Sequence, residues 1–126
     1  MRKLATLVFV LFLSAAVGQL HAQSLKNTAW KFYVESLHDT LTMHIGVDTN
    51  VTTSSAGEMI VRSRYQVVKD TIKITDIDGQ YPCLDGEGIY RYVMEGDYMT
   101  FHLVSDPCGN RSEALKEVRF LKTVGK

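Results

Sequence analysis

The chain has 126 residues, of which 14 are Lys or Arg and 14 are Asp or Glu, so its formal net charge is zero. With 45% hydrophobic and 22% charged residues, it has the composition of one ordinary globular domain, neither disordered nor low in complexity. The charge balance argues against a nucleic-acid-binding protein, because such proteins normally carry a basic excess or a basic patch.

The N-terminal residues 1–22 have the three parts of a secretory signal peptide. A short basic start is followed by an almost wholly apolar stretch, residues 4–17, and then by small residues up to Ala22. We expect cleavage after Ala22, with Gly18 as the alternative site. The apolar stretch is short for a membrane span. Residues 23–126 are therefore expected to form a single exported domain, periplasmic or secreted, with no membrane span after cleavage.

From Thr28 onward, apolar residues recur with a period of two, which is typical of half-buried β-strands. Residues 51–57 are small and polar, which predicts a loop or a weak edge strand. Only residues 111–116 look helical, as a single turn. The domain is therefore expected to be all-β, and the alternation is clearest in residues 40–47, 58–68, 71–75, 99–103 and 117–120.

Residues 65–76 and 92–103 share one repeated unit. In each, a Tyr lies five residues before an Asp, and alternating apolar residues follow. The unit places tight turns at Lys69-Asp70 and at Gly96-Asp97, which predicts β-hairpins. Hairpins in series make a meander, and a meander removes its exposed edges by closing into an up-and-down barrel. We therefore expect a small antiparallel barrel of about seven or eight strands with one short helical turn near the C-terminus.

Cys83 and Cys108 are the only two cysteines. In an oxidising compartment they are expected to form a disulfide. This bond would join the longest irregular stretch, residues 76–88, to the turn after the strand that ends near Ser105. Two free thiols or a metal site are the alternatives, but zinc normally has four ligands and no His lies near either Cys in the sequence.

Three segments resemble the small bacterial lipocalin-like domains of the calycin group: residues 25–32 with Trp30, residues 88–92, and residues 104–111 around Cys108. The resemblance implies a small antiparallel barrel with an apolar interior that can hold a ligand. The lipocalin signature Gly-x-Trp has Gly where this chain has Thr28.

The same resemblance implies that a basic residue packs over Trp30 at the barrel floor. Arg119 is the candidate by its position on the last strand. Alternation places Arg119 on the face opposite Phe120, however, so Arg111 is its rival for this role.

The binding hypothesis uses the side chains that are expected to point into the barrel. Tyr hydroxyls would orient a ligand, and Met side chains would let an apolar pocket adapt to it. The alternative is that these residues only fill the barrel as core, because protein interiors pack densely. The candidate ligand-binding residues are Phe32, Met43, Tyr65, Tyr90, Tyr92, Met99 and Phe101. The rest of the expected inward set is Val34, Leu41, Ile45, Met59, Val61 and Leu103.

Other candidate chemistry is weak. The acids of residues 76–88 (Asp76, Asp78, Asp85 and Glu87) suggest Ca²⁺ ligands, but they lack EF-hand spacing, so we expect solvated charge at the barrel rim. His44 and His102 lack a third ligand for a metal. No nucleophile elbow, zinc-protease, phosphate-loop or dinucleotide motif occurs.

The sequence therefore predicts a non-enzymatic exported barrel, without cofactor or metal, that binds a small apolar or amphipathic molecule. The alternative is a protein-interaction module, such as an inhibitor or an envelope accessory protein. Such a module would have a filled interior and would act through rim loops at residues 51–57 or 76–88.

Overall fold

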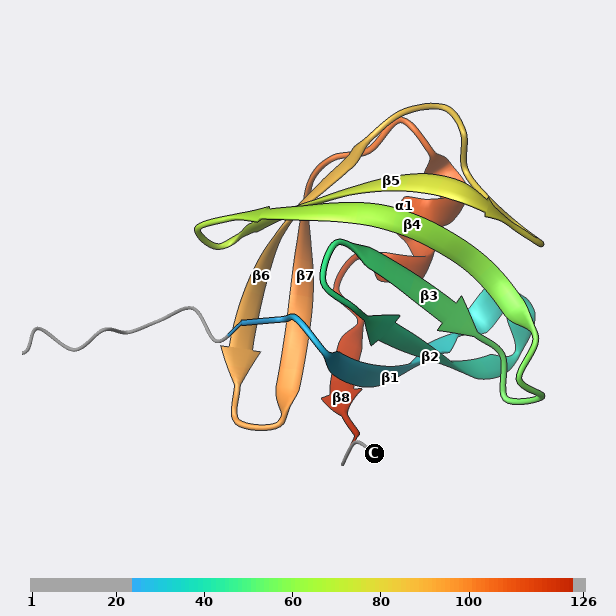
Figure 1. Cartoon of the computed structure of the whole chain (residues 1–126), viewed down its shortest axis with the longest axis horizontal. Helices are drawn as coiled ribbons and strands as arrows, with labels where there is room; N and C mark the ends of the chain where they lie inside the picture. Colours follow the sequence, from blue (N-terminus) through green and yellow to red (C-terminus); the bar gives the residue numbers. More distant parts are fainter. Residues whose placement is uncertain (1–23, 124–126) are drawn as a thin grey trace, which may run out of the picture.

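The computed structural model describes residues 24–123, which form a closed barrel of antiparallel strands (Figure 1). Each strand pairs with its neighbours in the sequence, and the first strand pairs with the last. The strands are β1 (Thr28–Val34), β2 (Asp39–Ile45), β3 (Thr49–Thr53), β4 (Met59–Val68), β5 (Thr71–Gly79), β6 (Gly88–Glu95), β7 (Tyr98–Ser105) and β8 (Arg119–Lys122). The predicted all-β up-and-down barrel is confirmed, with eight strands. The expected signal peptide lies outside the described residues.

The two predicted hairpin turns are also confirmed. Val68 pairs with Thr71 across the β4–β5 turn, and Glu95 pairs with Tyr98 across the β6–β7 turn. Lys69 has φ 58° and Gly96 has φ 61°. Positive φ values suit the tight turns whose twist matches that of paired strands, and Gly adopts them without steric cost.

Residues 51–57 were expected to be a loop or a weak edge strand, yet β3 covers part of this segment. It pairs with β2 on one side and with β4 on the other, so it is not an edge. Strand β5 also continues to Gly79, which shortens the predicted rim loop to residues 80–87. Pairing with β4 explains both differences, because it gives a partner to segments whose own β-propensity is low.

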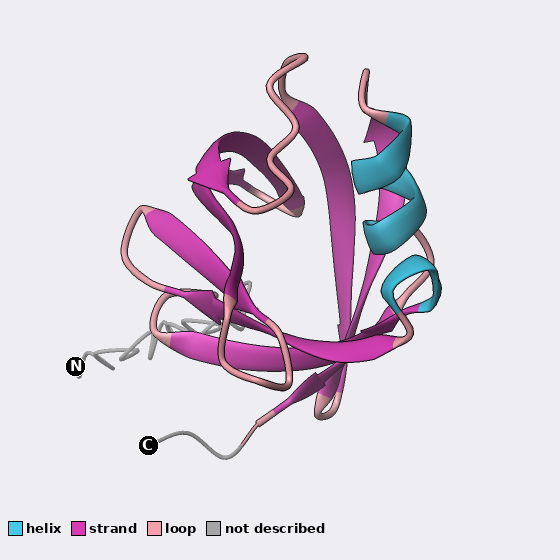
Figure 2. Ribbon diagram, turned by 90° about the vertical axis from the view of Figure 1, so that its right-hand side faces the viewer, coloured by secondary structure: helices cyan, strands magenta, loops and turns pink. Residues whose placement is uncertain are grey.

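Two short helices lie at the same end of the barrel (Figure 2). The 3₁₀ segment η1 (Glu35–Leu37) links β1 to β2, and the α-helix α1 (Gly109–Leu115) links β7 to β8. Helix α1 occupies the place of the predicted helical turn. Its buried side chains are those of Arg111, Ser112 and Leu115, so a charged residue lies on the inner face of the helix.

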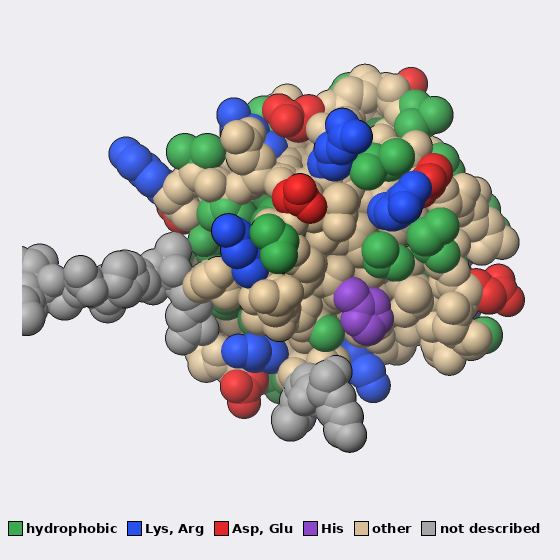
Figure 3. All heavy atoms as spheres, in the orientation of Figure 1, with side chains coloured by type: hydrophobic (Ala, Val, Ile, Leu, Met, Phe, Trp, Pro, Cys, Tyr) green, Lys and Arg blue, Asp and Glu red, His purple; other side chains and the backbone are tan. Residues whose placement is uncertain are grey.

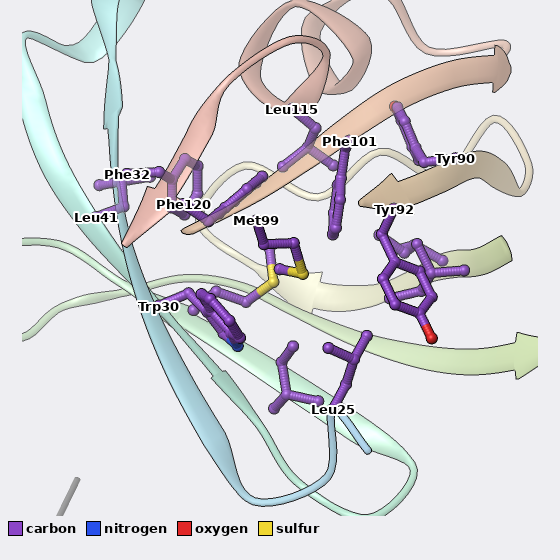
Figure 4. Close-up of a cluster of buried hydrophobic side chains, with 14 of the residues drawn as sticks. Leu25, Trp30, Phe32, Leu41, Tyr90, Tyr92, Met99, Phe101, Leu115 and Phe120 are labelled. Carbon is purple, nitrogen blue, oxygen red and sulfur yellow. The ribbon is translucent and has the colours of Figure 1, made fainter. Parts of the chain in front are cut away.

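Aromatic side chains fill the barrel near β6, β7 and β8 (Figure 4). The ring centroid of Phe120 lies 4.8 Å from that of Phe32 and 4.6 Å from that of Phe101. Phe101 stacks in turn on Tyr90 at 5.7 Å. These separations are those of favourable aromatic pairs, so this part of the interior is a packed core.

Strand β4 departs from simple alternation. A β-bulge at Ile60 shifts the register against β3, where Thr52 pairs with Val61 and Thr53 pairs with Met59. As a result Ile60 is buried, whereas Met59 is 42% exposed. The prediction that Met59 points inward is wrong, because the bulge inserts one extra residue and reverses the faces of the strand before it.

Leu103 pairs with the buried Tyr90 and so shares its inner face, but the side chain is 42% exposed and is not part of the core. Strand β8 pairs only with residues from Tyr98 to Thr100 of β7. Leu103 therefore lies beyond the strand that would cover it.

The predicted disulfide is present between Cys83 and Cys108. It ties residues 80–87 to the start of α1, and both cysteines of the chain are thereby paired. The bond closes a segment with a sequence separation of 25 residues.

We expect the double substitution of Cys83 and Cys108 by Ala to lower the free energy of unfolding by about 3.5 kcal/mol, because the denatured chain gains the freedom of an unclosed loop. Alanine is chosen since both side chains are buried and a serine hydroxyl would have no assured partner. Urea unfolding of the variant and of reduced wild type should give the same loss. A difference below about 1 kcal/mol from oxidised wild type would contradict the prediction.

Candidate functional site

A cavity of about 750 Å³ opens at the barrel end that carries η1, α1 and residues 80–87. It is walled by the inner faces of β1 to β5 and by α1. Sites for small molecules have volumes of about 300–1,000 Å³. The barrel interior is thus divided into an aromatic core and an open cavity.

One part of the cavity wall is apolar. It consists of buried side chains from β1, β2, β4 and β5: Phe32, Leu41, Met43, Ile60 and Ile74. The alternation of β1 and β2 predicts that Phe32, Leu41 and Met43 point inward. The β4 bulge brings Ile60 into the same wall.

A row of polar side chains crosses the wall from β3 to β5. Asn50 of β3 pairs with Ser63 of β4, and Ser63 pairs with Asp76 of β5. All three side chains point inward, with exposures of 2%, 1% and 8%. The Ser63 hydroxyl donates a hydrogen bond of 2.7 Å to Oδ1 of Asp76. Asp76 was expected to be solvated rim charge, and that expectation is wrong, because β5 extends past it and turns it into the barrel.

Arg111 projects from α1 toward the end of this row. Its Nε and Nη2 donate to the two carboxylate oxygens of Asp106, each at 2.8 Å, and Nη2 also donates to the carbonyl of Gly86 at 2.7 Å. Its Nη1 lies 3.5 Å from Oδ1 of Asp76. Arg111 thus joins the helix, the rim loop and the polar row, as a planar guanidinium with five donors can do.

Asp106 is stabilised as a carboxylate. Burial would raise the pKa of Asp106, but hydrogen bonds from Arg111, Tyr90 and the Cys108 amide outweigh burial and lower it. Burial and the same carboxylate raise the pKa of Tyr90 strongly. The Tyr90 hydroxyl therefore stays protonated and donates to Asp106.

Two buried donors of the cavity wall have no hydrogen-bond partner among the described residues. They are Nδ2 of Asn50 and Nη1 of Arg111. Leaving a buried donor unpaired costs about 1–3 kcal/mol, so such groups are rare in folded proteins. These two atoms are the most unusual chemical feature of the cavity.

The predicted ligand-binding residues do not form one set. Phe32 and Met43 line the large cavity. Tyr65 and Tyr92 line a second cavity of about 300 Å³, and their hydroxyls donate to the backbone carbonyls of Gly46 (2.6 Å) and Lys69 (3.1 Å).

The other three predicted ligand-binding residues, Tyr90, Met99 and Phe101, have 0% exposure in the packed core and line neither cavity. Sequence reasoning missed Asn50 and Ser63 altogether and assigned Asp76 and Arg111 other roles. The available signal was the alternation of β3 and β5, which places Asn50 and Asp76 on the inner face.

The barrel-floor prediction needs correction for both arginines. Trp30 is 1% exposed, and its indole nitrogen donates to the Thr28 hydroxyl at 2.9 Å. Arg119 points away from the core, with its guanidinium 3.9 Å from the ring centroid of Tyr98. Arg111 is engaged with Asp106. Alternation along β8 explains the position of Arg119, since its neighbour Phe120 occupies the inner face.

The outer surface carries mixed groups. On the face shown in Figure 3, hydrophobic side chains lie among charged groups of both signs. Near the cavity, Tyr81 is 60% and Leu84 is 71% exposed. Asp78, a calcium candidate, pairs instead with Arg62 at 2.5 Å.

Among residues 24–123, no group of three or more His, Cys, Asp or Glu side chains is placed to hold a metal ion. Within the same range, no helix has the length and apolar character needed to cross a membrane.

Comparison with protein-family models, curated proteins and solved structures found no match for this chain. The eight-strand antiparallel up-and-down barrel is compatible with a lipocalin-like fold.

Proposed function

We propose that this protein is an exported, non-enzymatic lipocalin-like barrel that binds a small amphipathic molecule in the cavity beside α1. The observation that carries the proposal is the cavity itself, about 750 Å³ in volume, with an apolar wall and a few buried polar groups. Binding sites for small molecules have this composition, because apolar contact provides affinity and a few polar groups provide orientation.

The division of the interior supports this choice over a filled barrel. The Phe32–Phe120–Phe101 cluster packs the β6–β8 side, so the fold is stabilised without closing the cavity. Export is supported by the signal-like sequence of residues 1–22 and by the Cys83–Cys108 disulfide, since such bonds persist in oxidising compartments.

The proposal is tested by binding of a neutral apolar fluorophore, N-phenyl-1-naphthylamine. We expect wild type to enhance its fluorescence saturably. Ala114→Trp should abolish this binding, because Ala114 lines the cavity and an indole there would occupy it. Glu113→Trp is the matched control and should bind as wild type does, since the Glu113 side chain is 73% exposed on the same helix.

Native mass spectrometry of protein purified gently from its own host supplies a test without variants. A bound small molecule that is lost on denaturation would support the proposal. Absence of a guest, together with no saturable uptake of the fluorophore by folded wild type, would overturn it.

A protein-interaction module is the second candidate, favoured by the exposed Tyr81 and Leu84 on the rim loop. Tyr is enriched among the residues that anchor protein interfaces. Under this alternative, Leu84→Ser should abolish partner binding, whereas Ala114→Trp, which fills the cavity, should leave partner binding unchanged.

A further inference from the structure

We infer that the cavity selects uncharged molecules bearing an acceptor oxygen, such as an ester, ketone or ether, which accepts hydrogen bonds from Asn50 and Arg111. This inference rests on the proposed function and specifies the chemical class of the ligand. The apolar part of such a molecule would contact the Phe32 side of the cavity.

Asn50 is the first reason. It lies on the inner face of β3 with 2% exposure, and its Nδ2 has no acceptor among the described residues. Rotation about the last torsion of an Asn side chain is soft, so the amide can turn its N–H toward the cavity that it lines. An acceptor oxygen on a ligand would give this donor the partner that it lacks.

Arg111 is the second reason. Four of its contacts orient the guanidinium rigidly: two to Asp106, one to Gly86 and the ion pair with Asp76. The remaining Nη1 has no hydrogen-bond acceptor among the described residues, because its 3.5 Å approach to Asp76 is an ion-pair contact only. Because Arg111 lines the cavity, its Nη1 is a second unpaired donor at the wall.

The local charge decides between neutral and ionic ligands. The positive charge of Arg111 is already matched by Asp106 and faces a second carboxylate, that of Asp76. The buried site is therefore negative by one charge, which disfavours a carboxylate or phosphate ligand. A ligand ammonium would be attracted by this charge but would leave both donors unpaired, because it has no lone pair to accept from Asn50 or Arg111.

The test measures displacement of N-phenyl-1-naphthylamine by methyl octanoate, octanoate and octylammonium. We expect wild type to bind the ester at least about tenfold more tightly than either ion. Asn50→Leu, which keeps the side-chain size and removes the donor, should weaken ester binding about tenfold, the effect of losing one hydrogen bond. The affinity for the fluorophore should stay within about twofold, which also reports that the variant is folded.

Asn110→Leu removes a different amide of the cavity wall. Because Asn110 lines the same cavity, the control that should leave the affinity for the ester unchanged is instead Thr40→Leu, since Thr40 is exposed on β2 and lines neither cavity. A measurement on wild type avoids variants altogether, since the side-chain amide protons of Asn50 should shift downfield in the NMR spectrum when methyl octanoate is added.

The outcomes are distinguishable. Tighter binding of octanoate or octylammonium than of the ester, or equal loss of ester and fluorophore affinity in Asn50→Leu, would overturn the inference and leave the cavity as a binding site. Failure of the fluorophore and all three octyl compounds to bind wild type would instead overturn the proposed function.

Discussion

Asp106→Ala is expected to lower the free energy of unfolding by about 3–5 kcal/mol. The Asp106 side chain is fully buried and accepts two hydrogen bonds from Arg111, whose own side chain is 6% exposed. Removing the carboxylate leaves a buried guanidinium without its main partner, which costs more than the loss of a solvated ion pair. Urea unfolding measured at neutral pH provides the test.

Asp78→Ala is the matched control, because it breaks another Asp–Arg pair. Asp78 and Arg62 are each 46% exposed, so this loss should be about 0.2–1 kcal/mol. Equal losses at Asp78 and Asp106 would contradict the assignment of Asp106 as the buried partner of Arg111.

The same carboxylate makes stability depend on pH. Although burial opposes it, the hydrogen bonds from Arg111 and Tyr90 lower the pKa of Asp106 in the folded protein. A carboxyl with a lowered folded pKa stabilises the native state fully above its unfolded pKa, and this contribution is lost as the pH falls through the folded pKa. Unfolding measured across the acid range should therefore show a loss in wild type that is smaller in Asp106→Ala.

Trp30→Ala is expected to cost about 3–5 kcal/mol of unfolding free energy. Trp30 is 1% exposed among the residues of the buried core (Figure 4). Removal of the indole leaves a cavity that the closed sheet cannot collapse to fill, so lost transfer free energy and cavity cost add.

Tyr33→Ala is the control for Trp30→Ala, since Tyr33 is an aromatic residue on the same strand that is 50% exposed. Its loss should stay below about 1 kcal/mol. A cost below about 1 kcal/mol for Trp30→Ala as well would place Trp30 outside the stabilising core.

The barrel was predictable because its signals are local. Alternation of apolar residues marks a half-buried strand within a few residues, and the Lys69-Asp70 and Gly96-Asp97 turns define hairpins without reference to distant parts of the chain. The disulfide was predictable for another reason, because a chain with only two cysteines leaves a single possible pairing within it.

The cavity was not predictable to the same extent. The same apolar alternation predicts that Phe32, Met43, Met99 and Phe101 point inward. Phe32 and Met43 line the cavity, however, whereas Met99 and Phe101 lie in the packed core. Whether an inward side chain meets another side chain or open space depends on strands far apart in the sequence.

The sequence was sufficient to establish period-two strands, tight turns and a cysteine pair, since each depends on near neighbours or on simple counting. Tertiary structure decided which polar groups are buried together. Antiparallel pairing of β4 with β3 and with β5 placed Asn50 and Asp76 on either side of Ser63, and α1 brought Arg111 to the end of the row. Register and closure are long-range properties, because one extra residue in a strand reverses the face on which the preceding residues lie.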